Sequence, residues 1–128
     1  MFDAAYKLKI AAERGVLTVT ASGSYALRRS LRMISAVREH AERHALTRVL
    51  LETTAVPQPI PDVDLAALGE EAARTWQGLT VAILHRSRTP GNSATVVARN
   101  RGANVRVFSS DADAMNWLMG SAVETPPP

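Results

Sequence analysis

The sequence predicts an α/β fold, with a mixed, mostly parallel five-stranded sheet and four helices in the order β-β-α-β-α-β-α-β-α. Two observations predict it. After about residue 16, short runs rich in Val and Leu alternate with longer segments whose apolar residues recur every three or four positions. This alternation is typical of crossover units, whose strands are parallel. Before it, two strand-like segments follow each other across a tight turn, which indicates an antiparallel hairpin.

The hairpin occupies the first part of the chain. Residues 6–10 alternate between apolar and polar, as a half-buried strand does. Residues 13–15 form a turn in which Gly15 can adopt a positive φ. Residues 16–21 are rich in Val and Thr and form the second strand. The first strand therefore joins the sheet as an antiparallel edge, with Tyr6, Leu8 and Ile10 facing the helices.

Two crossovers follow the hairpin. A helix capped by Ser24 and running to about His44 carries one apolar stripe: Leu27, Leu31, Ile34, Val37 and Ala41. Residues 48–52 form the third strand, and a loop with three prolines covers residues 53–61. Asp62 or Asp64 caps the second helix, which Gln77-Gly78 ends. Residues 79–84 are apolar on both faces and therefore form a central strand.

The last third of the chain completes the sheet. After a polar loop at residues 85–91, Asn92 or Ser93 caps a third helix that ends at Gly102. Residues 105–108 form the fifth strand. Ser110 and Asp113 make a capping box for a last helix through Met119. We expect one domain over residues 1–120 and a disordered, proline-rich tail over residues 121–128.

Composition excludes several classes of function. The chain has no cysteine, which excludes a disulfide scaffold, a thiolate metal site and cysteine catalysis. The net charge is +3, and thirteen of the fifteen basic residues are Arg, which we attribute to coding bias; nucleic-acid binding is not favoured without clustering on one face. No stretch has the length of a membrane helix and no leader pattern opens the chain, so we expect a cytoplasmic protein.

The C-terminal stretch from Gly102 to Leu118 resembles the ending of STAS/SpoIIAA-like domains. In both, a strand of the type Val-Arg-Val-Phe (residues 105–108) leads into a polar cap and a helix with a Trp-Leu pair, here Trp117-Leu118. The resemblance implies a β-α superhelix, the fold shared with lipid-binding Sec14-like domains. It also implies a stand-alone bacterial member of a family that includes anti-sigma factor antagonists and cytoplasmic domains of anion transporters.

One departure from the family pattern affects function. The antagonists carry an Asp-Ser-Ser-Gly type motif after the third strand, and a partner kinase phosphorylates its serine. Residues 52–65 of this chain contain neither Ser nor Gly, and the nearest hydroxyls, Thr53 and Thr54, come too early. We therefore predict a non-enzymatic binding or regulatory domain without the phosphorylatable serine, which acts through a protein partner or a small anionic or lipid-like ligand.

A ligand of such a domain would lie at the carboxyl ends of the parallel strands, where open α/β sheets bind their ligands. The residues that we expect there are hydroxyls, an arginine and the polar start of the third helix: Thr53, Thr54, Arg86, Ser87, Asn92 and Ser93. A helix N-terminus with hydroxyls and Arg can hold a phosphate or carboxylate. The alternative is a small enzyme, with Glu52 and His85 as an acid–base pair assisted by Arg86.

Two further clusters have weaker support. Arg28, Arg29 and Arg32 lie in the first turns of the first helix, where cations oppose the helix dipole, so they are a candidate patch for an anion or a partner. His40 and His44 have a metal-binding spacing but no third ligand, so no metal and no cofactor is predicted.

The second face of the sheet has an apolar middle that needs cover. If all crossovers run in one direction, their helices share one face and leave residues such as Ala82, Leu84 and Phe108 on the other. A homodimer is the simplest cover. The alternative is that the N-terminus or a helix of the same chain folds across this face.

Overall fold

The computed structural model describes residues 6–23, 26–55, 62–85 and 98–123 of the 128-residue chain. Its sheet has the order β1-β2-β3-β4-β5. β1 is antiparallel to β2, and the other neighbours are parallel. The predicted mixed, mostly parallel sheet with an antiparallel edge is confirmed. The strands are β1 (Tyr6–Glu13), β2 (Val16–Gly23), β3 (Arg48–Ala55), β4 (Thr80–Leu84) and β5 (Asn104–Phe108).

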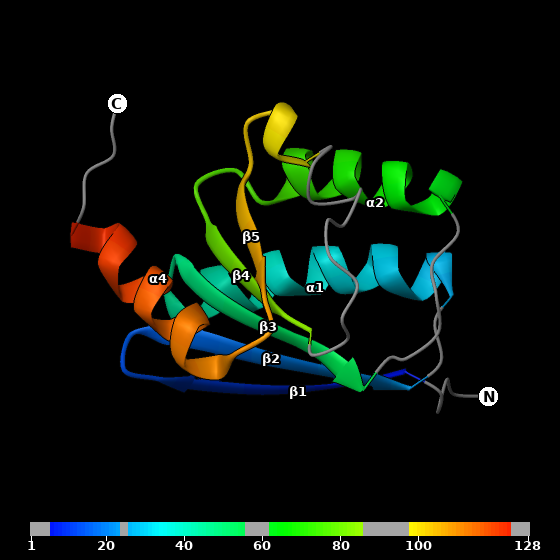
Figure 1. Cartoon of the computed structure of the whole chain (residues 1–128). Helices are drawn as coiled ribbons and strands as arrows, with labels where there is room; N and C mark the ends of the chain where they lie inside the picture. The colour runs from blue at the N-terminus through cyan, green and yellow to red at the C-terminus, as the bar shows by residue number, and fades with distance from the viewer. Residues whose placement is uncertain (1–5, 24–25, 56–61, 86–97, 124–128) are drawn as a thin grey trace.

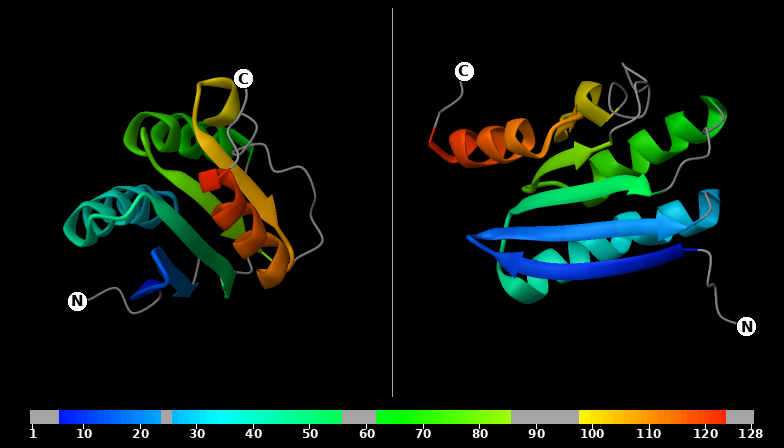
Figure 2. Two further views of the ribbon diagram at one scale, coloured as in Figure 1. Left: turned by 90° about the vertical axis from the view of Figure 1, so that its left-hand side faces the viewer. Right: turned by 60° about the horizontal axis from the view of Figure 1, so that its bottom comes forward.

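The helices lie on both faces of this sheet. Helix α1 (Leu27–His44) connects β2 to β3, and α2 (Asp62–Thr75) connects β3 to β4. Both cover one face, whereas α4 (Asp111–Val123) covers the other, so the described part of the chain has three layers (Figures 1 and 2). Residues 98–100 are the described end of the predicted third helix, whose start lies outside the described residues.

The β1–β2 hairpin extends to a two-residue turn. Arg14 and Gly15 both have positive φ, at 57° and 75°, as a type I′ turn requires. The twist of this turn matches that of the strands, so pairing continues without interruption from Tyr6↔Gly23 to Glu13↔Val16. β1 therefore reaches three residues beyond the predicted end at Ile10. Ile10 packs against the core on the α1 side, as predicted.

The main core lies between the sheet and helices α1 and α2. It holds Leu17 and Val19 of β2, Val49 and Leu51 of β3, and Val81 of β4, with Met33, Ile34, Val37 and Ala41 of α1 and Leu68, Ala72 and Trp76 from α2 and its end. The alternate residues of each strand face this core, as the period of two predicts. Trp76 is 4% exposed and donates its indole N–H to the Ile34 carbonyl at 3.0 Å, which ties the two helices together.

A second core lies under α4. Ala114 and Leu118 of α4 are fully buried against Leu50 of β3 and Ala82 and Leu84 of β4. The last helix has no following strand, so no crossover fixes its side of the sheet, and burial of this apolar middle determines where it packs. Of the two predicted covers for this face, the structure has the helix of the same chain.

The helix ends differ from prediction in three places. Helix α2 begins at Asp62, so Asp62 and Asp64 both lie within the helix instead of capping it. The cap of α1 is Ala26, in an extended conformation and with no side-chain cap hydrogen bond, so the helix starts later than a cap at Ser24 requires; Ser24 itself lies outside the described residues. α4 runs to Val123 rather than Met119, so the first three residues of the predicted tail are helical.

The predicted cap of α4 is confirmed. Ser110 Oγ accepts from the Asp113 backbone N–H at 3.3 Å. None of the helices within the described ranges is long and apolar enough to cross a membrane.

Candidate functional site

Thr53 and His85 meet at the carboxyl ends of β3 and β4. Thr53 Oγ1 lies 3.0 Å from His85 Nδ1 and 3.5 Å from the Leu84 carbonyl oxygen. Both side chains are half-buried. The two residues meet because β3 and β4 are parallel and stay in register up to Glu52↔Leu84, so both strands end at the same edge of the sheet. The sequence prediction that Thr53 lies at this edge is therefore correct in position.

The local geometry of β3 helps to place Thr53. Between Glu52 and Ala55, three residues of β3 advance against two of β2, from Thr20 to Ser22, which is a β-bulge. Bulges re-aim side chains and are common beside functional sites. The hydroxyl can donate to the Leu84 carbonyl while it accepts from the imidazole, or it can donate to Nδ1 directly. In both arrangements, Thr53 and His85 bind each other.

The register separates Glu52 from this pair. Glu52 is aligned with Leu84, whose side chain is in the core beneath α4, so Glu52 belongs to the same face. Successive residues of a strand point to opposite faces. His85 follows Leu84 and hydrogen bonds to Thr53 instead. The register therefore places Glu52 on the face opposite Thr53, and the acid–base pair of Glu52 and His85 stays a prediction.

Four of the other predicted ligand residues belong to segments that the structure does not describe. Arg86, Ser87, Asn92 and Ser93 lie outside the described residues, and the backbone of Thr54 is described as part of β3 but not its side chain. The predicted site at the strand ends is thus represented by Thr53 alone. It stays a prediction as a ligand site.

The predicted arginine patch lies near the same edge. Arg28 and Arg32 are exposed and Arg29 is half-buried, all in the first turns of α1. No acidic residue occupies the first turn of this helix. The N-terminus of α1 is at the end of the molecule where β2 and β3 terminate (Figure 1). The three cations are therefore near the carboxyl edge of the sheet, as the topology requires.

The two histidines of α1 have a structural role. The His44 Nδ1 lies 3.0 Å from the His40 carbonyl oxygen, so its side chain contributes to the C-terminal end of the helix. Within the described ranges, no group of three His, Cys, Asp or Glu residues could hold a metal ion.

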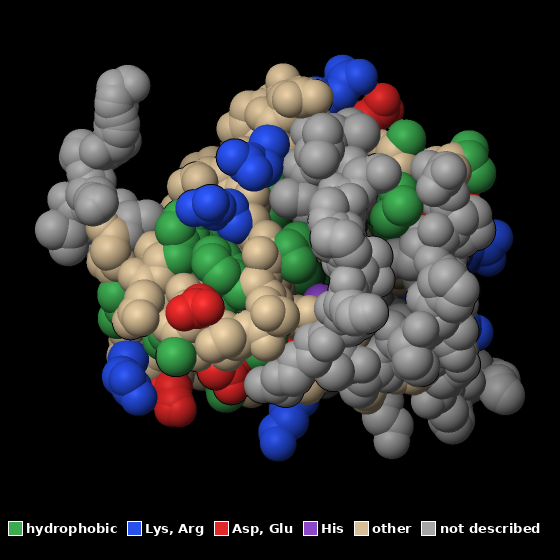
Figure 3. All heavy atoms as spheres, in the orientation of Figure 1, with side chains coloured by type: hydrophobic (Ala, Val, Ile, Leu, Met, Phe, Trp, Pro, Cys, Tyr) green, Lys and Arg blue, Asp and Glu red, His purple; other side chains and the backbone are tan. Residues whose placement is uncertain are grey.

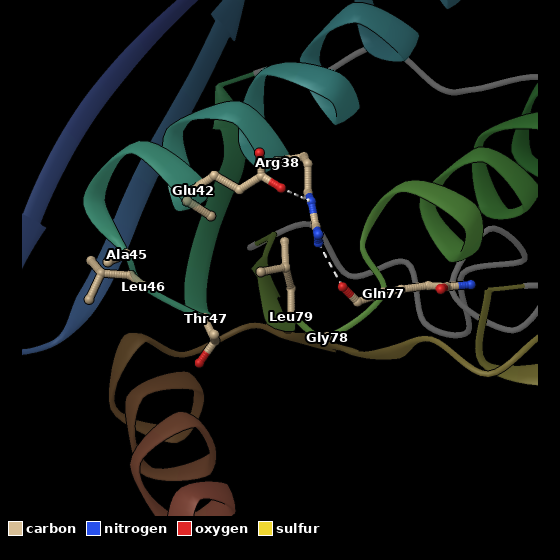
Figure 4. Close-up of a pocket in the computed structure, with 9 residues that line it drawn as sticks. Arg38, Glu42, Ala45, Leu46, Thr47, Gln77, Gly78 and Leu79 are labelled. Carbon is tan, nitrogen blue, oxygen red and sulfur yellow. Dashed lines mark hydrogen bonds and ion pairs between the residues drawn. The ribbon is translucent and has the colours of Figure 1, made fainter.

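Sequence reasoning missed a hollow at the opposite edge of the sheet. It has a volume of about 380 Å³ and lies between the C-terminal ends of α1 and α2 (Figure 4). Arg38 reaches across it from α1, and donates to Glu42 at 2.9 Å and to the Gln77 carbonyl at 2.6 Å. This contact places a cation at the end of α2, where the helix dipole favours one. The guanidinium is thus engaged in joining the two helices.

Two surface features were also missed. Val63, in the first turn of α2, is 75% exposed. Arg106 stacks over Trp117 at 5.9 Å, and the Phe108 and Trp117 rings are 5.6 Å apart. Hydrophobic side chains gather between α4 and β5 on the face seen in Figure 3. The sequence places Phe108 on the second face of the sheet but does not show its contact with Trp117, and an isolated exposed Val has no signature in the sequence.

Two solved structures are similar to this chain. One is an anti-sigma factor antagonist from Mycobacterium paratuberculosis, with a TM-score of 0.59 and 15% identity over 89% of this chain and 94% of the other. The other is an uncharacterized protein of the DUF3478 family from Shewanella loihica PV-4, described as having a SpoIIAA-like fold, with a TM-score of 0.54 and 17% identity over 88% of this chain and 93% of the other. The chain has a SpoIIAA-like fold.

At these identities, the likeness is one of fold. No protein-family model matches the sequence, and no curated protein matches it either. The predicted resemblance to STAS/SpoIIAA-like domains is confirmed at the level of the fold, over nearly the whole chain.

Proposed function

We propose that this protein is a non-enzymatic, cytoplasmic regulatory domain that binds a protein partner at the carboxyl edge of its sheet, through the first turn of α2. Support comes first from the fold, since a structural neighbour is an anti-sigma factor antagonist, a regulatory protein whose name implies a protein partner. The exposed Val63 then suggests where contact occurs.

The single observation that carries this surface is the exposure of Val63. It is more exposed than Met119, the other large exposed hydrophobic residue of the described chain, at 75% against 37%. Burial of such a side chain in an interface is worth about 1.5–3 kcal/mol. An exposed Val at the start of a helix does not pack in the core. Its burial by a partner therefore adds to the free energy of binding and leaves the stability of the fold unchanged.

A small anionic or lipid-like ligand is the alternative. The strand-end site supports such a ligand less well than a protein partner, because Thr53 and His85 hydrogen bond to each other. The hollow that the structure describes lies at the other edge of the sheet. No phosphorylation switch is part of the proposal, since residues 52–65 lack the serine of the antagonist motif.

The test uses the protein expressed in its own host with a photoreactive amino acid at position 63 or, as the matched control, at position 119. The proposal expects one discrete protein adduct from position 63 and none from position 119. Val63→Asp should weaken the isolated partner's binding about tenfold or more, and Met119→Asp should leave it unchanged. Equal crosslinking from both positions, or a Val63→Asp variant that binds as tightly as the wild type, would overturn the assignment.

Native mass spectrometry of the purified protein decides between the two kinds of partner. Stoichiometric extra mass of a few hundred daltons, lost on denaturation, would identify a small ligand and contradict the proposal. Bound mass of protein size would support it.

A further inference from the structure

We propose that the outer edge of β1 pairs with β1 of a second copy of this chain, in antiparallel orientation, to give a continuous ten-stranded sheet. The first observation is the edge itself. β1 has eight residues, where strands average about five or six. Among the described elements, only β2 and α1 contact it substantially. Its register with β2 has no bulge, so the strand is regular over its whole length.

The hairpin turn determines which backbone groups face outward. In a two-residue hairpin, the residues that flank the turn, here Glu13 and Val16, exchange both backbone hydrogen bonds. Peptide groups alternate along a strand. Those of Leu8, Ile10 and Ala12 therefore point away from β2, where a further strand would find its donors and acceptors.

An exposed regular edge of this length is a template for another strand unless it is protected. Proteins commonly protect edges with lysine, proline or a bulge. β1 contains neither proline nor bulge, and its charged residues are Lys7, Lys9 and Glu13. All three occupy odd-numbered positions of β1, and the side chains of Lys9 and Glu13 belong to the face opposite the α1 side that Ile10 packs against.

The positions of these charges along β1 make the strand complementary to a second, antiparallel copy of itself. In an antiparallel copy centred on Ile10, Glu13 lies opposite Lys7 of the second copy; centred on Ala11, it lies opposite Lys9. In both registers the charged positions of the two strands share one face of the sheet, and Ile10 lies on the other. Because the dimer has a two-fold axis, each Glu–Lys pair occurs twice. A strand with lysines alone would repel its own copy, whereas Glu13 makes β1 complementary to itself in this orientation.

This dimer is not the one expected from the second face of the sheet. That expectation rested on an uncovered apolar surface, which α4 covers. Pairing at β1 leaves the first turn of α2 accessible. It is therefore independent of the proposed function, and either can fail without the other.

The test measures the oligomeric state of the full-length protein by sedimentation velocity up to about 1 mM, where even weak association is detected. We expect a reversible dimer. Glu13→Lys alone, and Lys7→Glu with Lys9→Glu, should each weaken it about tenfold, because like charges then oppose each other. An equimolar mixture of these two variants should form a heterodimer at least as stable as the wild-type dimer.

Glu39→Lys is the matched control, with the same charge change at an exposed position of α1, and should leave the dimer unchanged. Amide hydrogen exchange then locates the surface. The N–H groups of Ile10 and Ala12 should exchange more slowly in the dimer, whereas that of Ala11, which faces β2, should be protected in both states. A monomer throughout, or a dimer in which Ile10 and Ala12 exchange as in the monomer, would refute the proposal, as would charge variants that behave like the wild type.

Discussion

Replacement of Leu118 by Ala tests whether α4 is an integral layer of this domain. The Leu118 side chain is 0% exposed and is packed in the second core with Leu50 and Leu84. Buried Leu→Ala changes remove the transfer free energy of the lost methyl groups and leave a cavity, at a combined cost of about 2.7–5.0 kcal/mol. This site is bounded by a rigid sheet on one side, so we expect about 3–4 kcal/mol.

Urea unfolding gives the measurement. With a slope of about 2 kcal/mol per molar urea, a loss of 3–4 kcal/mol lowers the midpoint by about 1.5–2 M. The two tryptophans report on different layers, Trp117 on the second core and Trp76 on the main core. Both should lose their native fluorescence at the same lower midpoint if the layers unfold together.

Met119, in the same helix, provides the control for the Leu118→Ala variant. Met119, the next residue, is 37% exposed, and Met119→Ala should cost less than about 1 kcal/mol. A loss below about 1 kcal/mol in Leu118→Ala, or a Trp117 transition that precedes the Trp76 transition in the wild type, would show that α4 is only loosely attached. The claim that α4 takes the place of a dimer partner on this face would then be wrong.

Three other predictions concern helix ends and the joint between α1 and α2. Ala26→Ser should stabilise the protein by about 1 kcal/mol in thermal unfolding, because Ala26 has cap geometry but no side-chain acceptor; no change would mean that other groups already satisfy the first turn. Ala45→Gly should also stabilise it, by about 1 kcal/mol, since Ala45 is left-handed at φ 57°; a loss of stability would contradict this reading. Trp76→Phe should cost about 1–2 kcal/mol in urea unfolding through the lost bond to Ile34, and an unchanged midpoint would show that this bond contributes nothing.

Sequence periodicity determined the order and kind of the described elements, because local apolar patterns reflect which side of each segment is buried. The alternation at residues 6–10 placed Ile10 on the core side, and the Ser110–Asp113 spacing placed the start of α4. Caps and strand ends were harder to predict, since they depend on backbone geometry. The hydroxyl of Ser24 favours it as a cap, whereas the chain enters the helix at Ala26 without such a cap.

The candidate site was predictable only in outline. Parallel topology alone implies that Thr53 and His85 lie at one edge of the sheet. The sequence could not decide whether His85 would pair with Glu52 or with Thr53, because that depends on strand register and on the bulge in β3. The sequence also showed Val63 only as one apolar residue among others in a helix.

The sequence by itself determined the α/β class, the hairpin with its parallel crossovers, and the apolar content of both faces of the sheet. Only the tertiary structure decided what covers the second face. A helix that follows the last strand is not bound by the handedness of a crossover, so local sequence does not choose its side of the sheet. The free energy of burying Leu118 and Ala114 against β3 and β4 makes that choice, and it arises only between segments far apart in the chain.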